Sequence, residues 1–92
     1  MTNQSSKFLP RKTVRDQIED KRGYLFDEET GYVYELNETG CKIWILLKEG
    51  LSNEEIVSKM AQEYDVDVTT LENDVKEFLK RLVEYGILEV VR

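Results

Sequence analysis

The side chains that most often carry catalysis are scarce in this sequence. Its 92 residues include no histidine and a single cysteine, Cys41, so they offer no histidine-activated nucleophile and no ordinary set of zinc ligands. They also contain no glycine-rich phosphate loop. The 19 aspartates and glutamates are typical of solvated faces, and no two of them stand out as a tuned acid and base. The sequence therefore predicts a protein with no catalysis of its own, no metal and no cofactor.

Two smaller features could suggest chemistry, and each has a simpler interpretation. Asp65 and Asp67 resemble the start of a calcium loop, but the glycine and the distal glutamate of that loop are missing at the required offsets. Cys41 could be a reactive thiol. Because no histidine is present to activate it, we interpret Cys41 as a small buried packing residue.

The charge of the chain is unevenly distributed. The formal net charge is −6, but residues 1–22 carry +3 and residues 23–92 therefore carry −9. An acidic body repels phosphate backbones, which argues against nucleic acid as the main partner.

Length and hydropathy indicate one small domain. The chain is long enough for a single modest core. No apolar run approaches the roughly 18 residues of a membrane span, and the first seven residues lack the apolar segment of a signal peptide. We expect a cytoplasmic protein with a flexible N-terminal tail at residues 1–11 and one folded domain at residues 12–92.

The first half of this domain has the pattern of an antiparallel meander. Three strands are predicted, at residues 13–18, 24–27 and 31–36. We expect Gly23 and Gly31 to supply a positive φ in the two connections. The third strand alternates, with Tyr32, Tyr34 and Leu36 on one face and Val33 and Glu35 on the other. So small a sheet needs a helical layer to be stable.

Three helices are predicted to supply this layer. Asn37 is a suitable N-cap for a helix that ends near Lys48, and Ser52 with Glu55 forms a capping box for a second helix ending near Tyr64. The third helix is expected to start from a similar pair, Thr69 and Glu72, and to reach Tyr85 before Gly86. Gly40, inside the first helix, suggests a close approach to a neighbouring backbone. Residues 87–91 are expected to form a short strand or a packed tail.

The third helix has an unusually wide apolar face. At about 100° per residue, one stripe contains Leu71, Val75, Phe78 and Leu82, and we predict that this stripe faces the core. Leu79 and Val83 lie further round the helix. Either the helix packs against both the sheet and the other helices, or the Leu79/Val83 flank lines a groove beside the sheet.

Together these elements predict an α+β fold of winged helix-turn-helix type, with an N-terminal three-stranded meander followed by three helices. Such a fold raises the question of DNA binding. The third helix would be the recognition helix, but its charged residues sum to −1, whereas a DNA-reading helix concentrates arginine and lysine. A shared fold does not imply a shared function. The exposed edge of the small sheet, next to a wide apolar helix flank, instead favours binding of a peptide by β-strand addition.

The order and spacing of several motifs resemble the PqqD family. The resemblance includes residues 34–44, which read Y-E-L-N-E-T-G-C-K-I-W, then Leu46-Leu47 and Gly50. It continues through residues 52–56, 64–67, 74–82 and 86–88, and covers about residues 23–91. Members of this family are peptide chaperones, or RiPP recognition elements. They bind the leader segment of a ribosomally made precursor peptide and present it to a modifying enzyme, such as the radical SAM protein of pyrroloquinoline quinone biosynthesis.

The resemblance implies where a leader peptide would bind. It would add as an antiparallel strand along residues 32–36, so that the expected contacts there are Tyr32, Val33, Tyr34, Glu35 and Leu36. Val75, Leu79 and Val83 would line the adjacent pocket, and Lys76 and Lys80 could pair with carboxylates of the leader. The expected partners are therefore a precursor peptide and a maturase, without nucleic acid or membrane. Two alternatives remain open: a winged-helix DNA-binding regulator, and an assembly domain that dimerises through its free strand edge.

Overall fold

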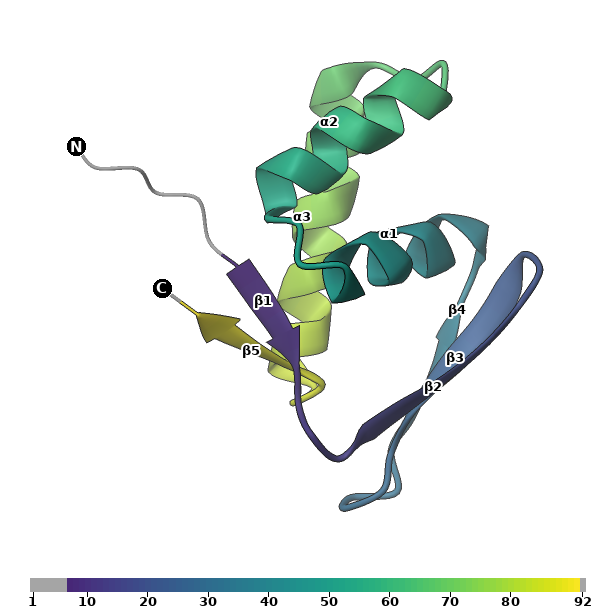
Figure 1. Cartoon of the computed structure of the whole chain (residues 1–92), viewed down its shortest axis with the longest axis vertical. Coiled ribbons are helices and arrows are strands. Elements are labelled where there is room, and N and C mark those ends of the chain that lie inside the picture. Colours follow the sequence, from purple (N-terminus) through teal and green to yellow (C-terminus); the bar gives the residue numbers. More distant parts are fainter. Residues whose placement is uncertain (1–6, 92) are drawn as a thin grey trace.

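The computed structural model describes residues 7–91, which form a three-stranded sheet, three helices and a separate two-stranded ribbon (Figure 1). The antiparallel sheet has the order β2-β3-β4, formed by Val14–Glu19, Arg22–Asp27 and Val33–Leu36. The helices are α1 (Glu38–Lys48), α2 (Asn53–Glu63) and α3 (Val68–Glu84). The ribbon pairs β1 (Lys7–Pro10) with β5 (Leu88–Val91). The predicted meander followed by three helices is confirmed.

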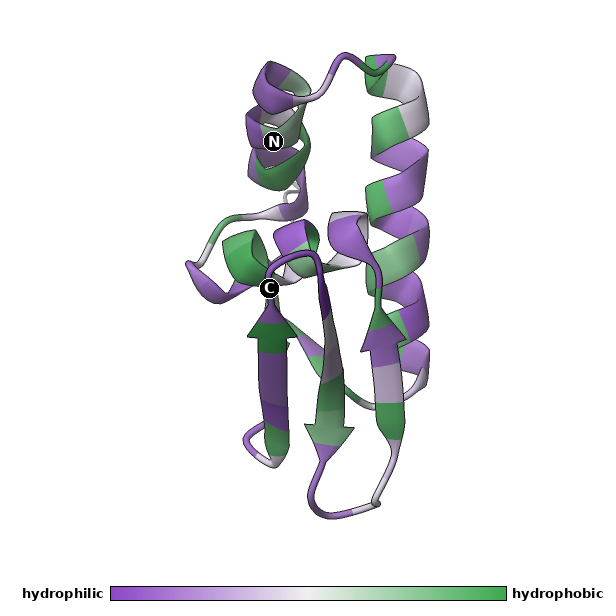
Figure 2. Ribbon diagram, turned by 90° about the vertical axis from the view of Figure 1, so that its right-hand side faces the viewer, coloured by the Kyte–Doolittle hydropathy of each residue, from purple (hydrophilic) through white to green (hydrophobic). Residues whose placement is uncertain are grey.

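The helices cover one face of the sheet and leave the other to solvent. Helix α1 contacts β3 and β4 as well as α2 and β1, whereas α3 packs on α2 and β5 and runs beside β4 (Figure 2). Trp44, Leu25 and Ile56 are among the fully buried side chains of the resulting core. On the opposite face of the sheet, Tyr24 and Phe26 are exposed.

The ribbon corrects the expectation of a flexible tail at residues 1–11. Lys7–Pro10 form β1, whose register with β5 places Lys7 opposite Val91, and Phe8 packs against the core. The ribbon is secured by a hydrogen bond of 2.9 Å from the Arg11 amide to the Ile87 carbonyl. The sequence pattern did not reveal β1 because four residues that end in a proline show too little alternation to be recognised. Residues 1–6 lie outside the described residues.

One of the two predicted glycine turns is different in the structure. Gly31 has a φ of 80°, as expected, but in the β2–β3 turn the positive φ of 56° belongs to Asp20. Gly23 lies inside β3, where a Cβ atom would come within 2.6 Å of the Gln17 carbonyl oxygen. The glycine is therefore required at this position for close approach between strands and not for a left-handed backbone.

Two of the three predicted helix caps are confirmed. The Asn37 side chain accepts a hydrogen bond from the Gly40 amide at 2.8 Å, and Ser52 forms its capping box with Glu55. The third prediction is wrong, because α3 begins at Val68 and its N-cap is Asp67, which accepts from the Thr70 amide at 3.2 Å. An aspartate two residues earlier is a stronger cap than a threonine.

The assignment of the α3 faces also needs correction. Leu79, expected on a groove-lining flank, is only 2% exposed and belongs to the core together with Leu71, Val75 and Leu82. Phe78, expected in the core, is only partly buried. The buried stripe is therefore centred further toward Leu79, because α3 packs against both α2 and β5.

Cys41 is 3% exposed, which confirms its interpretation as a packing residue. Burial raises the pKa of its thiol, and the nearby Glu38 acts in the same direction. Among the described residues, none of the helices has the length and apolar character that crossing a membrane requires.

Candidate functional site: an open strand edge beside α3

Strand β4 forms one edge of the sheet over the described residues. The Tyr32 carbonyl accepts a hydrogen bond from the Asp27 amide at 2.9 Å, so the backbone of Tyr32 points toward β3. In an antiparallel ladder the backbone direction alternates from residue to residue. The backbone N–H and C=O groups of Tyr34 and Leu36 therefore also point toward β3, where these residues lie opposite Leu25 and Gly23. The N–H and C=O groups of Val33 and Glu35 point away from the sheet, toward the open edge.

Helix α3 meets this edge through aromatic side chains. The ring of Tyr34 lies 6.3 Å from that of Phe78 and 5.8 Å from that of Tyr85, between centroids. Tyr32 approaches Tyr85 more closely, with centroids 5.0 Å apart. Arg81 donates a long hydrogen bond of 3.5 Å from Nη1 to the Tyr34 hydroxyl oxygen. One side of α3 therefore faces the inner side chains of β4 with two aromatic rings and a guanidinium.

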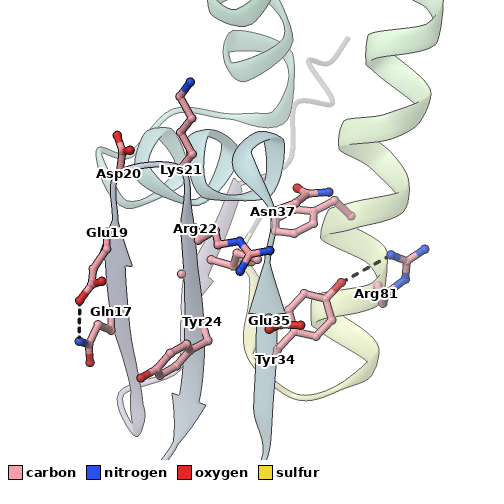
Figure 3. Close-up of a pocket in the computed structure, with 13 residues that line it drawn as sticks. Gln17, Glu19, Asp20, Lys21, Arg22, Tyr24, Tyr34, Glu35, Asn37 and Arg81 are labelled. Carbon is pink, nitrogen blue, oxygen red and sulfur yellow. Dashed lines mark hydrogen bonds between the residues drawn. The ribbon is translucent and has the colours of Figure 1, made fainter.

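A cavity of about 750 Å³ opens between the end of β4, the β2–β3 turn and α3 (Figure 3). Tyr34, Leu36 and Asn37 form its β4 wall, and Phe78 and Arg81 form its α3 wall. The remaining lining comes from β2, β3 and their connection, and from β4: Gln17, Glu19, Asp20, Lys21, Arg22, Gly23, Tyr24 and Glu35. A smaller hollow of about 340 Å³ continues along α3 and shares Asn37, Phe78 and Arg81 with the first.

Gly40 fixes the distance between α1 and α3 at this point. A Cβ atom on Gly40 would lie 3.2 Å from Cε1 of Phe78, 3.3 Å from Oδ1 of Asn37 and 3.4 Å from Cδ2 of Leu36. All three neighbours line the larger cavity. The close approach suspected from the sequence therefore exists, although it involves side chains and not a neighbouring backbone.

The environment of the rings and the guanidinium affects their protonation. Burial, followed by the neighbouring Tyr85, raises the pKa of the Tyr32 phenol. The hydrogen bond to Tyr34 raises the pKa of Arg81, so this side chain keeps its positive charge. Over the described residues, no cluster of three or more histidine, cysteine, aspartate or glutamate side chains could hold a metal.

The structure brings only part of the predicted site together. Tyr34, Glu35 and Leu36 line the cavity, while Tyr32 and Val33 lie exposed at the other end of the strand. Val75 and Leu79 are buried in the core, and Val83 packs against that core. Lys76 and Lys80 are exposed on α3, about 140° and 100° around the helix from Arg81.

Sequence reasoning missed three residues of α3 and its C-cap that meet β4, namely Phe78, Arg81 and Tyr85. Their spacing of three, four and seven places them on one side of the helix. The signal in the sequence was the second aromatic residue, Tyr85, seven positions after Phe78. Two large aromatic rings at this spacing indicate a contact surface on one side of the helix. A helical-wheel projection centred on the aliphatic residues does not reveal this surface.

The fold and this site can be compared with known proteins. A solved structure described as TbiB1 in complex with the TbiA(beta) leader peptide is 36% identical in sequence, with a TM-score of 0.83 over 87% of this chain and 93% of that one. A second, described as lasso peptide synthetase B1 complexed with the leader peptide, is 26% identical, with a TM-score of 0.82 over 90% of this chain and 98% of that one. A search of curated proteins finds no match.

The family model described as Coenzyme PQQ synthesis protein D (PqqD) matches residues 22–88. The match runs from the first residue of β3 to the first residue of β5, so it includes the open edge and all three helices. The chain belongs to the PqqD family.

Proposed function

We propose that this protein binds the leader segment of a ribosomally synthesised precursor peptide and presents the peptide to a modifying enzyme. The observation that carries the proposal is the open edge of β4, where the backbone groups of Val33 and Glu35 lie beside the cavity lined by Tyr34, Phe78 and Arg81. Membership of the PqqD family and the two similar structures, each described as a complex with a leader peptide, support it.

The leader adds to β4 as a fourth, antiparallel strand of the sheet. Its backbone pairs with the N–H and C=O groups of Val33 and Glu35, which set register and supply affinity without regard to sequence. Every second side chain of the leader then points toward α3, on the face occupied by Tyr34, and packs among Tyr34, Phe78 and Tyr85. Val75 and Leu79 support this surface from the core, where their burial keeps α3 in place.

The protein contributes binding and presentation to this process, and the covalent chemistry belongs to its partner. A radical SAM maturase or another RiPP-modifying enzyme is the partner that the family suggests. We place the encounter in the cytoplasm, where ribosomally made precursors are produced.

Hydrogen exchange on ¹⁵N-labelled protein tests the proposal at single residues. The probe is a synthetic leader from a precursor peptide encoded beside this protein. At saturation the amides of Val33 and Glu35 should become protected, because they gain partners in the new strand. The Tyr34 amide, already paired with β3, serves as the internal control and should change little. Unchanged exchange at Val33 and Glu35 in the presence of saturating leader would refute the proposal.

The two alternatives predict other observations. Binding to DNA would appear as duplex affinity that falls steeply with salt. Dimerisation through β4 would appear as a concentration-dependent sedimentation coefficient, and the leader would reverse it by competing for the same edge. If the protein stays monomeric, and if the amides of Val33 and Glu35 are protected only in the presence of leader peptide, dimerisation is excluded and leader binding is supported.

A further inference from the structure

Arg81 occupies the junction of the two hollows beside β4. It lines both of them, together with Asn37 and Phe78, and it extends from α3 toward the ring of Tyr34 (Figure 3). A guest strand on β4 directs alternate side chains to the face of Tyr34 and Leu36, which is the face that α3 covers. The guanidinium is therefore close to the inward-facing side chains of such a strand.

Most of the N–H donors of Arg81 have no close partner among the described residues. Its polar contact there is the Tyr34 hydroxyl at 3.5 Å, the outer limit of a hydrogen bond, although a guanidinium has five N–H donors. Glu77 lies one helical turn earlier, and with Asp74 it lines the smaller hollow beside Arg81. Besides the hydrogen bond to Tyr34, the charge of Glu77 helps to raise the pKa of Arg81, but the ion pairs of residues 7–91 do not include one between these two charged residues. Arg81 is instead turned toward β4.

Two other cations line the larger cavity, but they are positioned differently. Lys21 belongs to the β2–β3 turn. Arg22 precedes the inward-facing Gly23 and so lies on the solvent face of the sheet, with Tyr24. Of the three cations that line the larger cavity, Arg81 is the one next to Tyr34 and Phe78, on the inner face of the sheet.

We propose that Arg81 is a specificity-determining residue, which selects leaders with an aspartate or glutamate at one inward-facing position of the bound strand. The assignment rests on the proposed function and extends it by naming the chemistry that the site reads. A guanidinium binds a carboxylate through two parallel hydrogen bonds, and this exposed guanidinium lies next to the rings of Tyr34 and Phe78, where a guest side chain would meet it. The net charge of −6 leaves an acidic leader residue few favourable positions on this domain, and Arg81 is the one that lies on the inner face beside β4.

Selection from a phage-displayed library of random dodecapeptides tests the assignment. Four forms of the full chain are used as bait: the wild type, Arg81→Gln, Arg81→Glu and the control Lys59→Gln, which removes an exposed cation from α2, a helix that lines neither hollow. Wild type and Lys59→Gln should enrich alternating apolar peptides with one acidic position. Arg81→Gln should keep the apolar pattern and lose the acid, and Arg81→Glu should replace it with lysine or arginine.

Binding of a selected peptide to the wild type then measures the pair directly. Changing its acidic residue to the amide should weaken binding about tenfold, which corresponds to about 1.4 kcal/mol. The same change should have no effect on binding to Arg81→Gln. Acid enrichment that persists in Arg81→Gln, or an apolar pattern without any acid on the wild type, would overturn the assignment and leave strand addition intact. If none of the four baits enriches alternating peptides, strand addition itself is contradicted. The role of Arg81, which depends on strand addition, is then contradicted as well.

Discussion

Trp44, on α1, donates its indole N–H to Oδ2 of Asp16, on β2, over 2.7 Å. The same carboxylate oxygen pairs with Nζ of Lys48 at 2.6 Å, one turn further along α1. Asp16 thus ties the outermost strand of the sheet to the helix that covers it. Because β2 is the other edge strand, this contact is important for keeping β2 and β3 in place behind β4.

Asp16 should make stability depend on pH. The hydrogen bonds from Lys48 and then Trp44 hold the pKa of Asp16 below its ordinary value. Because the pKa of Asp16 is lower in the folded than in the unfolded protein, its ionised form stabilises the fold at pH values above the unfolded-state pKa, near 4. This stabilisation is lost as the pH falls through the folded-state pKa. We expect Asp16→Asn to cost about 1 kcal/mol at pH 7 and progressively less as the pH falls below about 4. Urea denaturation at pH 7 and at a series of acidic pH values measures this difference. Asp20→Asn is the control, since asparagine tolerates the positive φ at that turn.

The corrected faces of α3 predict opposite effects for two neighbouring residues. Leu79→Ala removes a core side chain and should cost about 3 kcal/mol of unfolding free energy. Phe78→Ala removes a partly buried ring, so it should cost less, about 1–2 kcal/mol, while it weakens leader binding more. Denaturation and titration with leader peptide measure the two quantities. If Phe78→Ala lowers the free energy of unfolding more than Leu79→Ala does, Phe78 faces the core, as the sequence pattern predicted.

The backbone of Glu35 can be tested without changing the inner face of the strand. Glu35→Pro removes an N–H group that points to the open edge, so the ladder with β3 stays complete and the protein should remain folded. Leader binding should fall by at least about tenfold, because one main-chain hydrogen bond is lost and the proline ring obstructs the guest. Glu35→Thr, which keeps the N–H, is the control and should bind nearly as well as the wild type. Equal affinity of the proline variant would show that the guest does not pair at this position.

Cys41 should be inert in the folded protein. It is buried and the pKa of its thiol is raised, so little thiolate is available to react. We expect a disulfide reagent such as Ellman's to label the native protein slowly and the urea-unfolded protein at once. Leader binding should survive Cys41→Ala, since this side chain does not line the cavities. Rapid labelling of the native state would mean that α1 opens readily.

Much of the fold could be predicted from local sequence because its signals are local. Strand alternation, the cap at Asn37 and the capping box at Ser52 each depend on residues a few positions apart. The β1–β5 ribbon could not be found this way, since it joins residues more than 75 positions apart and its strands have only four residues each. The structural reason for Gly23 is likewise non-local, because it depends on the Gln17 carbonyl of the neighbouring strand, which the glycine alone does not reveal.

The candidate site was only half predictable, for a related reason. The edge of β4 follows from the order of the strands, whereas the side of α3 that meets it depends on how the helix is rotated by packing on α2 and β5. A rotation of α3 by about 100°, the angle between consecutive residues, exchanges Leu79 for Phe78 at the groove. The periodicity specifies an apolar face but leaves this rotation open. The rotation of α3 is defined only by contacts between side chains in the folded protein, which are those among Tyr34, Phe78, Arg81 and Tyr85.

The β1–β5 ribbon also determines how the domain responds to mechanical force. Lys7 lies opposite Val91, so the two ends of the described chain lie together at one end of a short antiparallel ladder. Tension applied at these ends opens the ladder one pair after another and does not shear all of its hydrogen bonds at once. The ribbon is therefore a weak mechanical seam. A motor that pulls this domain apart from its ends would separate β1 and β5 first and then unwind α3, which a short connection at residues 85–87 joins to β5.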